Sequence, residues 1–230
     1  MVLPLSVSVV RYTRYSNLGL VTTPIESLCL KASPVPGACS FALALKEESG
    51  DSTANVDGKL PKYNHVKMKI AVTGHRPDRL GGYDADDNFR AIRRHMRGFL
   101  QGVRLGGVVD VTLIAGGALG IDQFWMEVGL HMGLSVTAAL PFEGYDSRWP
   151  VASRQKYAKL LDKCSDVRYV CEPGYDPAKL QRRNEWMVDQ CDLLVAYWAG
   201  TRSGGTSNCI TYAEQQNCDR EVFYLQDIIS

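Results

Sequence analysis

The stretch Leu113-Ile-Ala-Gly-Gly-Ala-Leu-Gly-Ile-Asp122 decides the fold. In it an apolar run is followed by three glycines, and a pattern typical of a helix begins directly after them. Residues 111–115 are apolar enough for a buried strand, and residues 121–132 keep apolar side chains at helical spacing. A strand, a glycine turn and a helix N-terminus together form an anion site, because unpaired N–H groups and the helix dipole point at the ligand. The stretch therefore predicts a strand–turn–helix unit suited to a phosphate, although such turns are often only structural.

The chain after Met68 alternates strand and helix patterns. Strands are predicted at 69–73, 111–115, 135–140, 167–171, 192–197 and 222–225, and helices at about 89–103, 121–132, 151–163, 178–190 and 206–217. Such alternation implies a parallel sheet that is covered on both faces and joined by right-handed crossovers. We therefore predict an α/β fold, a Rossmann-like three-layer domain with a mostly parallel sheet.

Residues 1–66 differ in character from residues 68–230. The first part holds five of the ten prolines, many Ser and Thr residues, and no sustained strand or helix period. We expect a poorly ordered extension over 1–66, or an upstream stretch that precedes the true start of the protein at Met68. The folded domain is predicted over 68–230.

Composition narrows the function classes. A chain of 230 residues with 45% apolar content fits one domain with an extension. A net charge of +1 without a basic block argues against general nucleic-acid binding. Seven cysteines form no CxxC pattern and no Cys/His cluster, so we expect reduced thiols, no metal and no cofactor. No apolar run reaches the roughly 20 residues of a membrane helix, and we predict a cytoplasmic protein.

The unusual residues of the sequence fall in loops that follow strands. These loops span 74–83, 115–122, 141–145 and 200–206. In a parallel sheet such loops all emerge at the carboxyl edge, where ligands bind. Random turn glycines would divide between the two edges, so their convergence predicts a ligand pocket at this edge.

Four motifs in this region also carry a resemblance. They are Thr73-Gly-His-Arg-Pro77 with Leu80-Gly-Gly82, Gly116-Gly-Ala-Leu-Gly-Ile-Asp122, Gln181-Arg-Arg-Asn184 followed by Met187-Val-Asp189, and Ser203-Gly-Gly-Thr206. Through them residues 69–225 resemble the YpsA-type branch of the SLOG superfamily, Rossmann-like proteins related to DprA and to the "lonely guy" cytokinin-activating enzymes. The resemblance implies a pocket for a nucleotide or a nucleotide-derived metabolite. It does not reach residues 1–66.

The predicted ligand-binding residues are glycines whose backbone can approach a phosphate and polar side chains beside them. The set is Gly74, His75, Arg76, Gly116, Gly117, Gly120, Asp122, Arg182, Asn184, Gly204, Gly205 and Thr206. The glycines would form two phosphate cradles, one at 116–120 and one at 204–206, and the alternative for each is turn geometry alone. No catalytic residue is assigned.

Each polar residue of this set also has a structural alternative. Arg76 suits a bidentate clamp on phosphate. His75 suits a general acid or base, although a histidine that hydrogen-bonds its own loop is commoner. Asp122 suits a ribose hydroxyl, or only the positive end of the helix dipole. An arginine near a helix N-terminus opposes the dipole, which suggests a ligand contact for Arg182 or Arg183.

Two aromatic residues and one hydroxyl complete the predicted site. Tyr83 and Phe142 lie on loops at the carboxyl edge and are candidates to stack on a base. Thr206 suits the N-cap of the last helix, where its hydroxyl would serve the helix or the ligand. Asn184 suits either loop anchoring or a ligand contact.

Three functions compete. The first is binding, sensing or sequestering a nucleotide-like small molecule. The second is cleavage of an N-glycosidic bond in a nucleoside monophosphate, as in the "lonely guy" enzymes, but Cys209 stands where their pattern has a glutamate. The third is DprA-like handling of single-stranded DNA, which needs a basic groove that 19 basic against 20 acidic residues beyond Met68 do not provide. Whether the protein is an enzyme or a homo-oligomer stays open.

Overall fold

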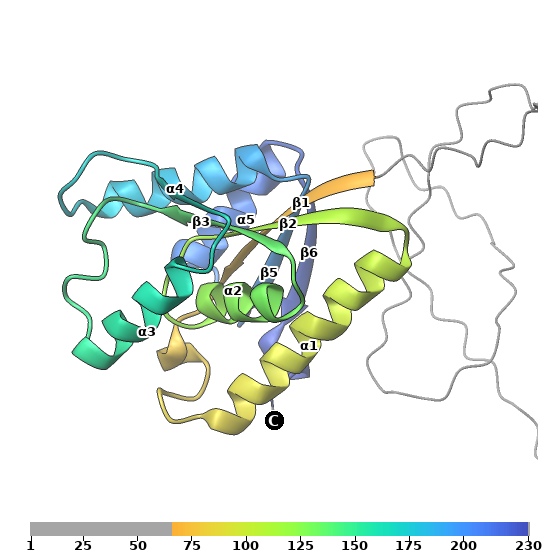
Figure 1. Cartoon of the computed structure of the whole chain (residues 1–230), viewed down its shortest axis with the longest axis horizontal. Helices are drawn as coiled ribbons and strands as arrows, with labels where there is room; N and C mark the ends of the chain where they lie inside the picture. The colour runs from red at the N-terminus through yellow and green to blue at the C-terminus, as the bar shows by residue number, and fades with distance from the viewer. Residues whose placement is uncertain (1–65, 230) are drawn as a thin grey trace, which may run out of the picture. The chain divides into compact units, whose positions relative to one another are not determined.

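The structure is a computed structural model that describes residues 66–229. Strands β1 (Val66–Gly74), β2 (Val108–Ala115), β3 (Ser135–Leu140), β4 (Asp166–Tyr169), β5 (Leu193–Trp198) and β6 (Asp219–Tyr224) alternate with helices α1 (Asp86–Leu105), α2 (Ile121–His131), α3 (Val151–Leu161), α4 (Pro177–Gln190) and α5 (Gly205–Gln215) (Figure 1). Two short 3-10 helices lie at Pro77–Arg79 and Leu225–Asp227. The predicted alternation is confirmed. The predicted extension over 1–66 lies outside the described residues, except for Val66.

All six strands are parallel and form one sheet in the order β4-β3-β2-β1-β5-β6. The chain steps from β1 outward to β4, then crosses back to β5 on the other side of β1. The connections that follow β1 and β5 therefore leave in opposite directions. This is the topological switch point of a Rossmann-like α/β fold, where a crevice opens at the carboxyl edge of the sheet.

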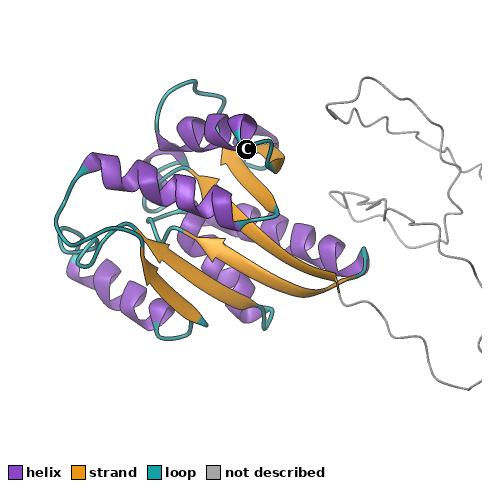
Figure 2. Ribbon diagram, turned by 90° about the horizontal axis from the view of Figure 1, so that it is seen from above, coloured by secondary structure: helices purple, strands orange, loops and turns teal. Residues whose placement is uncertain are grey.

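Helices cover both faces of the sheet (Figures 1 and 2). Helices α1, α2 and α3 pack in one layer, and α4 and α5 pack together in the other. Side chains of β1 alternate between the layers: Ile70 and Val72 join the core beneath α1 and α2, and Ala71 joins the core beneath α4 and α5. Burial on both faces explains the nearly continuous apolar runs of the central strands.

The first strand begins at Val66, three residues before the predicted start at Lys69. Val66 pairs with Val108 and Met68 with Val111, while Lys67 forms an ion pair with Asp110 at 3.4 Å. The early part of β1 thus alternates partly buried and exposed side chains. Its lysines interrupt the apolar run, and for that reason the sequence pattern placed the strand too late.

Among residues 66–229, no helix combines the length and the apolar character that a membrane span requires.

Candidate functional site

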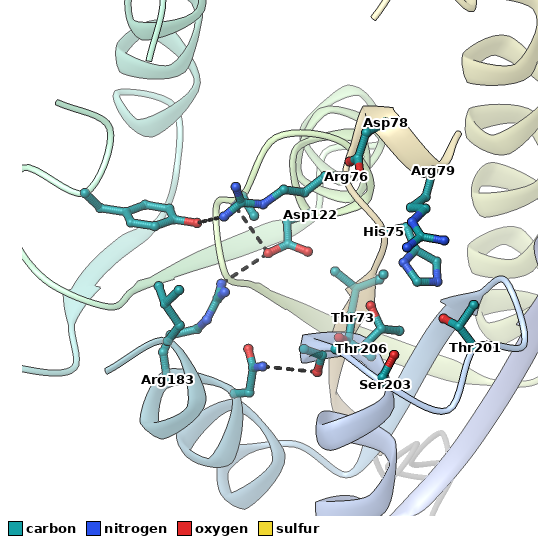
Figure 3. A pocket seen from close by; sticks show the side chains of 18 residues that line it. Thr73, His75, Arg76, Asp78, Arg79, Asp122, Arg183, Thr201, Ser203 and Thr206 are labelled. Carbon is teal, nitrogen blue, oxygen red and sulfur yellow. Dashed lines mark hydrogen bonds and ion pairs between the residues drawn. The ribbon is translucent and has the colours of Figure 1, made fainter. Parts of the chain in front are cut away.

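A pocket of about 320 Å³ opens at the carboxyl edge of the sheet, where β1 and β5 lie side by side (Figure 3). Its walls come from the loop after β1, the loop after β5 and the N-terminal turns of α2, α4 and α5. These segments are far apart in the sequence and meet because parallel strands deliver their loops to one edge. The pocket therefore lies where the topology predicts a ligand site.

Most of the predicted ligand-binding residues line this pocket. Those that do are Gly74, His75, Arg76, Asp122, Asn184, Gly204, Gly205 and Thr206. Those that do not are Gly116, Gly117, Gly120 and Arg182.

The glycines at 116–120 are packed against the protein itself. A Cβ added to Gly116 would overlap Nη1 of Arg183, and one added to Gly117 would overlap the hydroxyl of Tyr157. At Gly120 an added Cβ would lie 2.6 Å from the carbonyl oxygen of His75, and φ there is +96°. The structure thus places protein atoms against the backbone where a phosphate cradle was predicted.

The glycines at 204–205 are open. Gly204 has φ +101°, and an added Cβ would meet nothing within 4 Å among residues 66–229. At Gly205 it would meet only Nδ2 of Asn184, at 3.9 Å. Gly204 is the N-cap of α5 and Gly205 its first residue, so the unpaired N–H groups of the first helical turn begin at the pocket wall.

Thr206 occupies the second position of α5 and not the predicted N-cap. Gly204 takes the N-cap because its left-handed backbone turns the loop into the helix. Thr206 is buried, lines the pocket and stands beside the open glycines.

A buried ion pair forms one side of the pocket. Arg183 Nη1 from α4 lies 3.2 Å from Asp122 Oδ2 of α2, and the two side chains are 8% and 7% exposed. The backbone N–H of Ala118 donates to the same oxygen at 3.2 Å. Burial raises the pKa of Asp122, while Arg183 and the Ala118 N–H act to lower it. Asp122 is thus held in place by two donors from two different segments (Figure 3).

Arg183, and not the predicted Arg182, contributes this contact. Arg183 lies four residues before Met187, and both are buried, whereas Arg182 is exposed. The signal was available in the sequence, because residues four apart share a helix face and Met187 marks the buried one. Nε of Arg183 is also buried and has no hydrogen-bond partner within the part of the chain that the structure describes.

The loop after β1 carries two predicted residues with different surroundings. His75 Nε2 accepts a hydrogen bond from the Ala199 N–H at 3.0 Å, which ties this loop to the one after β5. Burial, followed by the nearby Arg79, lowers the pKa of His75, so the ring is neutral at pH 7. Arg76 is exposed, and its Nη2 donates to the hydroxyl of Tyr145 at 3.3 Å.

Tyr145 is the pocket-lining aromatic residue that the sequence reasoning missed. Of the two proposed stacking residues, Phe142 is buried and packs edge-on against Tyr145 and Tyr175, while Tyr83 is exposed and lies outside the pocket lining. Tyr145 shares the 141–145 loop with Phe142. The loop was therefore correctly placed, but which of its rings faces the pocket depends on the turn.

Hydroxyl groups and charges complete the lining. Thr73, Thr201 and Ser203 line one part of the pocket, and the cations of Arg79 and Arg76 line another (Figure 3). Within residues 66–229, no group of three or more His, Cys, Asp or Glu side chains is placed to hold a metal ion. The site is therefore built for hydrogen bonding and for charge, with cationic and acidic groups in one hollow.

The fold and the pocket define a Rossmann-like α/β protein with a ligand-sized hollow at its topological switch point. The chain belongs to the YpsA family, described as the YspA SLOG family, whose family model matches residues 70–228. The resemblance seen in the sequence motifs is thereby confirmed.

Relatives share this part of the chain. The SPbeta prophage-derived protein YoqJ of Bacillus subtilis is 33% identical over 128 residues, which cover 49% of this chain and 74% of YoqJ. A UPF0398 protein of Halalkalibacterium halodurans is 27% identical over 155 residues, covering 64% of this chain and 80% of the relative. The X-ray structure of DNA processing protein A (DprA) from Streptococcus pneumoniae is 19% identical with a TM-score of 0.49, covering 69% of this chain and 50% of that chain.

Proposed function

We propose that the pocket binds a nucleotide or a nucleotide-derived metabolite, with a phosphate group at the N-terminus of α5. The observation that carries this proposal is the open turn at Gly204 and Gly205, where no atom of the part of the chain that the structure describes takes the space beside the backbone. A helix N-terminus with free N–H groups and the positive end of the helix dipole favours an anion. Glycines let that anion approach the backbone closely.

Side chains around this turn suit the same anion. The hydroxyls of Ser203, Thr201 and Thr206 line this part of the pocket, and Arg76 and Arg79 line the same pocket from the loop after β1. Hydroxyl donors and guanidinium groups are ordinary partners of phosphate oxygens. The pocket volume of about 320 Å³ suits a small molecule and lies at the lower end of the usual range for ligand sites.

Asp122 supports a second subsite in the same pocket. Both of its hydrogen bonds described above end on Oδ2, and the residue lines the pocket. A fixed carboxylate accepts hydrogen bonds from hydroxyl groups and repels phosphate. We therefore assign the sugar hydroxyls of the ligand to Asp122 and the phosphate to α5, a division that a nucleotide satisfies.

Binding or sensing, rather than cleavage, is the activity that this site supports best. Cys209 stands where the related glycosidic-bond enzymes have a glutamate, and it is buried, with burial as the main cause that raises the pKa of its thiol to about 12. A buried neutral thiol does not replace a carboxylate in acid–base chemistry. Of the two carboxylates that line the pocket, Asp122 is already paired with Arg183, and Asp78 is exposed.

Native mass spectrometry of the protein purified from cells tests the proposal. We expect a co-purifying mass of a phosphorylated nucleoside compound, which can then be titrated by calorimetry into ligand-free protein. Gly205→Val should abolish that binding and keep a cooperative thermal melt. Gly98→Val is the matched control, because Gly98 is an exposed helical glycine of α1 where an added Cβ would meet no other described residue within 4 Å. Unchanged affinity in Gly205→Val would overturn the assignment of the phosphate to α5.

A further inference from the structure

Two thiols meet at the edge of the sheet opposite the pocket. Cys191 is the C-cap residue of α4, two positions before β5, and Cys218 directly precedes β6. Strands β5 and β6 are parallel neighbours with Leu193 opposite Asp219. The residues just before these two strands are therefore side by side, and the Sγ atoms of Cys191 and Cys218 lie 3.7 Å apart.

The surroundings of the pair allow reagents to reach it. Both cysteines are free and only partly buried, and each Sγ also contacts a backbone carbonyl at 3.4 Å, that of Val188 or of Asp219. A disulfide bond is about 2.05 Å long. To form a disulfide, the two sulfurs must move closer by roughly 2 Å or less. Side-chain rotation and small backbone adjustments can supply this shift.

The two thiols differ in reactivity. The hydrogen bond from Cys191 lowers the pKa of the Cys218 thiol, and this effect outweighs the opposing effect of burial. The same hydrogen bond, together with burial, raises the pKa of Cys191. The thiolate is the nucleophilic form of cysteine, so Cys218 is the thiol that reacts first and Cys191 the one that follows.

We propose that Cys191 and Cys218 form a reversible oxidation site, which closes into a disulfide when hydrogen peroxide reaches it. Cys218 sulfur attacks one peroxide oxygen, the O–O bond breaks, and a sulfenic acid and one water result. Cys191 sulfur then attacks the Cys218 sulfur, the S–O bond breaks, and the departing hydroxide takes the thiol proton as a second water. Two electrons pass from the two sulfurs to the peroxide, and a small thiol reverses the reaction by exchange.

The cross-link joins the end of α4 to the start of β6. It lies at the amino edge of the strands, whereas the pocket lies at the carboxyl edge. The inference is thus independent of the proposed function, and either can fail without the other.

Peptide mapping of the full chain tests the inference. The folded protein is treated with a few equivalents of hydrogen peroxide, its remaining thiols are blocked, and it is digested with trypsin without reduction. We expect peptide 184–202, which holds Cys191, to be linked to peptide 203–220, which holds Cys209 and Cys218. Fragmentation of the linked pair should place the bond on Cys218, and dithiothreitol should release both peptides.

Variants give the control. Cys191→Ser and Cys218→Ser should each lose the linked peptide, while Cys164→Ser, which removes another partly buried thiol, should keep it. A bond to Cys209, a linked peptide that forms only after unfolding in guanidinium, or no linked peptide in the wild-type protein would each overturn the inference. Because the wild-type map decides these outcomes, the inference stays testable even if a serine variant does not fold.

Discussion

Two glycine turns at the same edge of the sheet look alike in the sequence and differ in the structure. The turn at 116–120 and the turn at 204–205 both follow a strand and lead into a helix. At 116–120 the space beside the backbone is filled by Arg183, Tyr157 and the loop after β1, whereas at 204–205 it is open to the pocket.

The difference shows that a glycine can be required for two opposite reasons. It lets protein atoms pack against the backbone, or it lets a ligand do so. A phosphate motif read from glycine spacing alone does not distinguish the two cases. The atoms that an added Cβ would meet do distinguish them: they show packing at the first turn and open space at the second.

The largest expected effect is a difference in the free energy of unfolding between substitutions in the two turns. Gly120 and Gly204 have nearly equal φ values, +96° and +101°, but only at Gly120 would an added Cβ lie within 3 Å of a backbone atom, the carbonyl oxygen of His75 at 2.6 Å. We expect Gly120→Ala to cost about 4 kcal/mol or more of unfolding free energy, the range of severe packing defects. Gly204→Ala should cost only the backbone strain of a conformation at φ 101° and ψ 176° that suits glycine, about 1–3 kcal/mol. Urea denaturation measures both, and equal losses would remove the distinction.

The next effect concerns the ion pair that packs on the first turn. Asp122→Ala leaves the buried guanidinium of Arg183 without its partner, and breaking a buried pair costs about 3–5 kcal/mol. Asp78→Ala is the control, because Asp78 lines the same pocket but is exposed, and it should change stability by less than about 0.5 kcal/mol. Denaturation curves that coincide for the two variants would show that the pair does not stabilise the fold.

A smaller effect is expected on the affinity for the ligand that we propose to bind beside the second turn. Arg76→Ala should weaken binding of the phosphorylated ligand by about 1.5–3 kcal/mol, the range for hydrogen bonds to charged groups. The dephosphorylated ligand should lose much less. Arg182→Ala removes the same charge at an exposed position outside the pocket and serves as the control. Equal losses for both ligands in calorimetric titrations would mean that Arg76 shapes the loop and does not contact the phosphate.

The smallest expected effect is a pH dependence of stability. It comes from His75, which connects the loop after β1 to the loop after β5. The pKa of His75 is lowered in the folded state, chiefly by burial, and its neutral Nε2 accepts the Ala199 N–H. Stability from this group is thus complete above about pH 6.5, the unfolded value, and is lost as pH falls through the lower folded value. His95 has a lowered pKa as well and contributes in the same direction.

A variant isolates the contribution of His75. In His75→Gln the decline of the thermal midpoint between pH 6.5 and 5 should be shallower than in the wild-type protein, with the part due to His95 remaining. Identical slopes would show that protonation of His75 is not coupled to folding.

Much of the fold could be predicted because a sheet that is buried on both faces requires apolar strands and amphipathic helices, and both have recognisable sequence patterns. The start of β1 could not, since the exposed Lys67 and Lys69 alternate with the partly buried Val66 and Met68 and interrupt the apolar run. The location of the site followed from topology, which collects the loops after the strands at one edge. The choice of Arg183 over Arg182 was within reach of helix periodicity.

Other parts of the site depend on packing between distant segments. Tyr157 lies some 40 residues after Gly117, yet its hydroxyl occupies the space that makes Gly117 necessary. Whether Phe142 or Tyr145 faces the pocket is decided by the turn between them, and not by any period of the sequence. Such contacts are set by the assembled fold, so sequence spacing carries no sign of them.

The pair of Asp122 and Arg183 has a consequence for how this protein can change. Asp122 belongs to the helical layer on one face of the sheet and Arg183 to the layer on the other. This ion pair therefore links the two helical layers across the carboxyl end of the strands, and it also forms part of the pocket wall. Under the proposed function a substitution here would alter ligand preference and folding together, so we expect variants with new preferences to arise in the loops after β1 and β5 and to leave this pair intact.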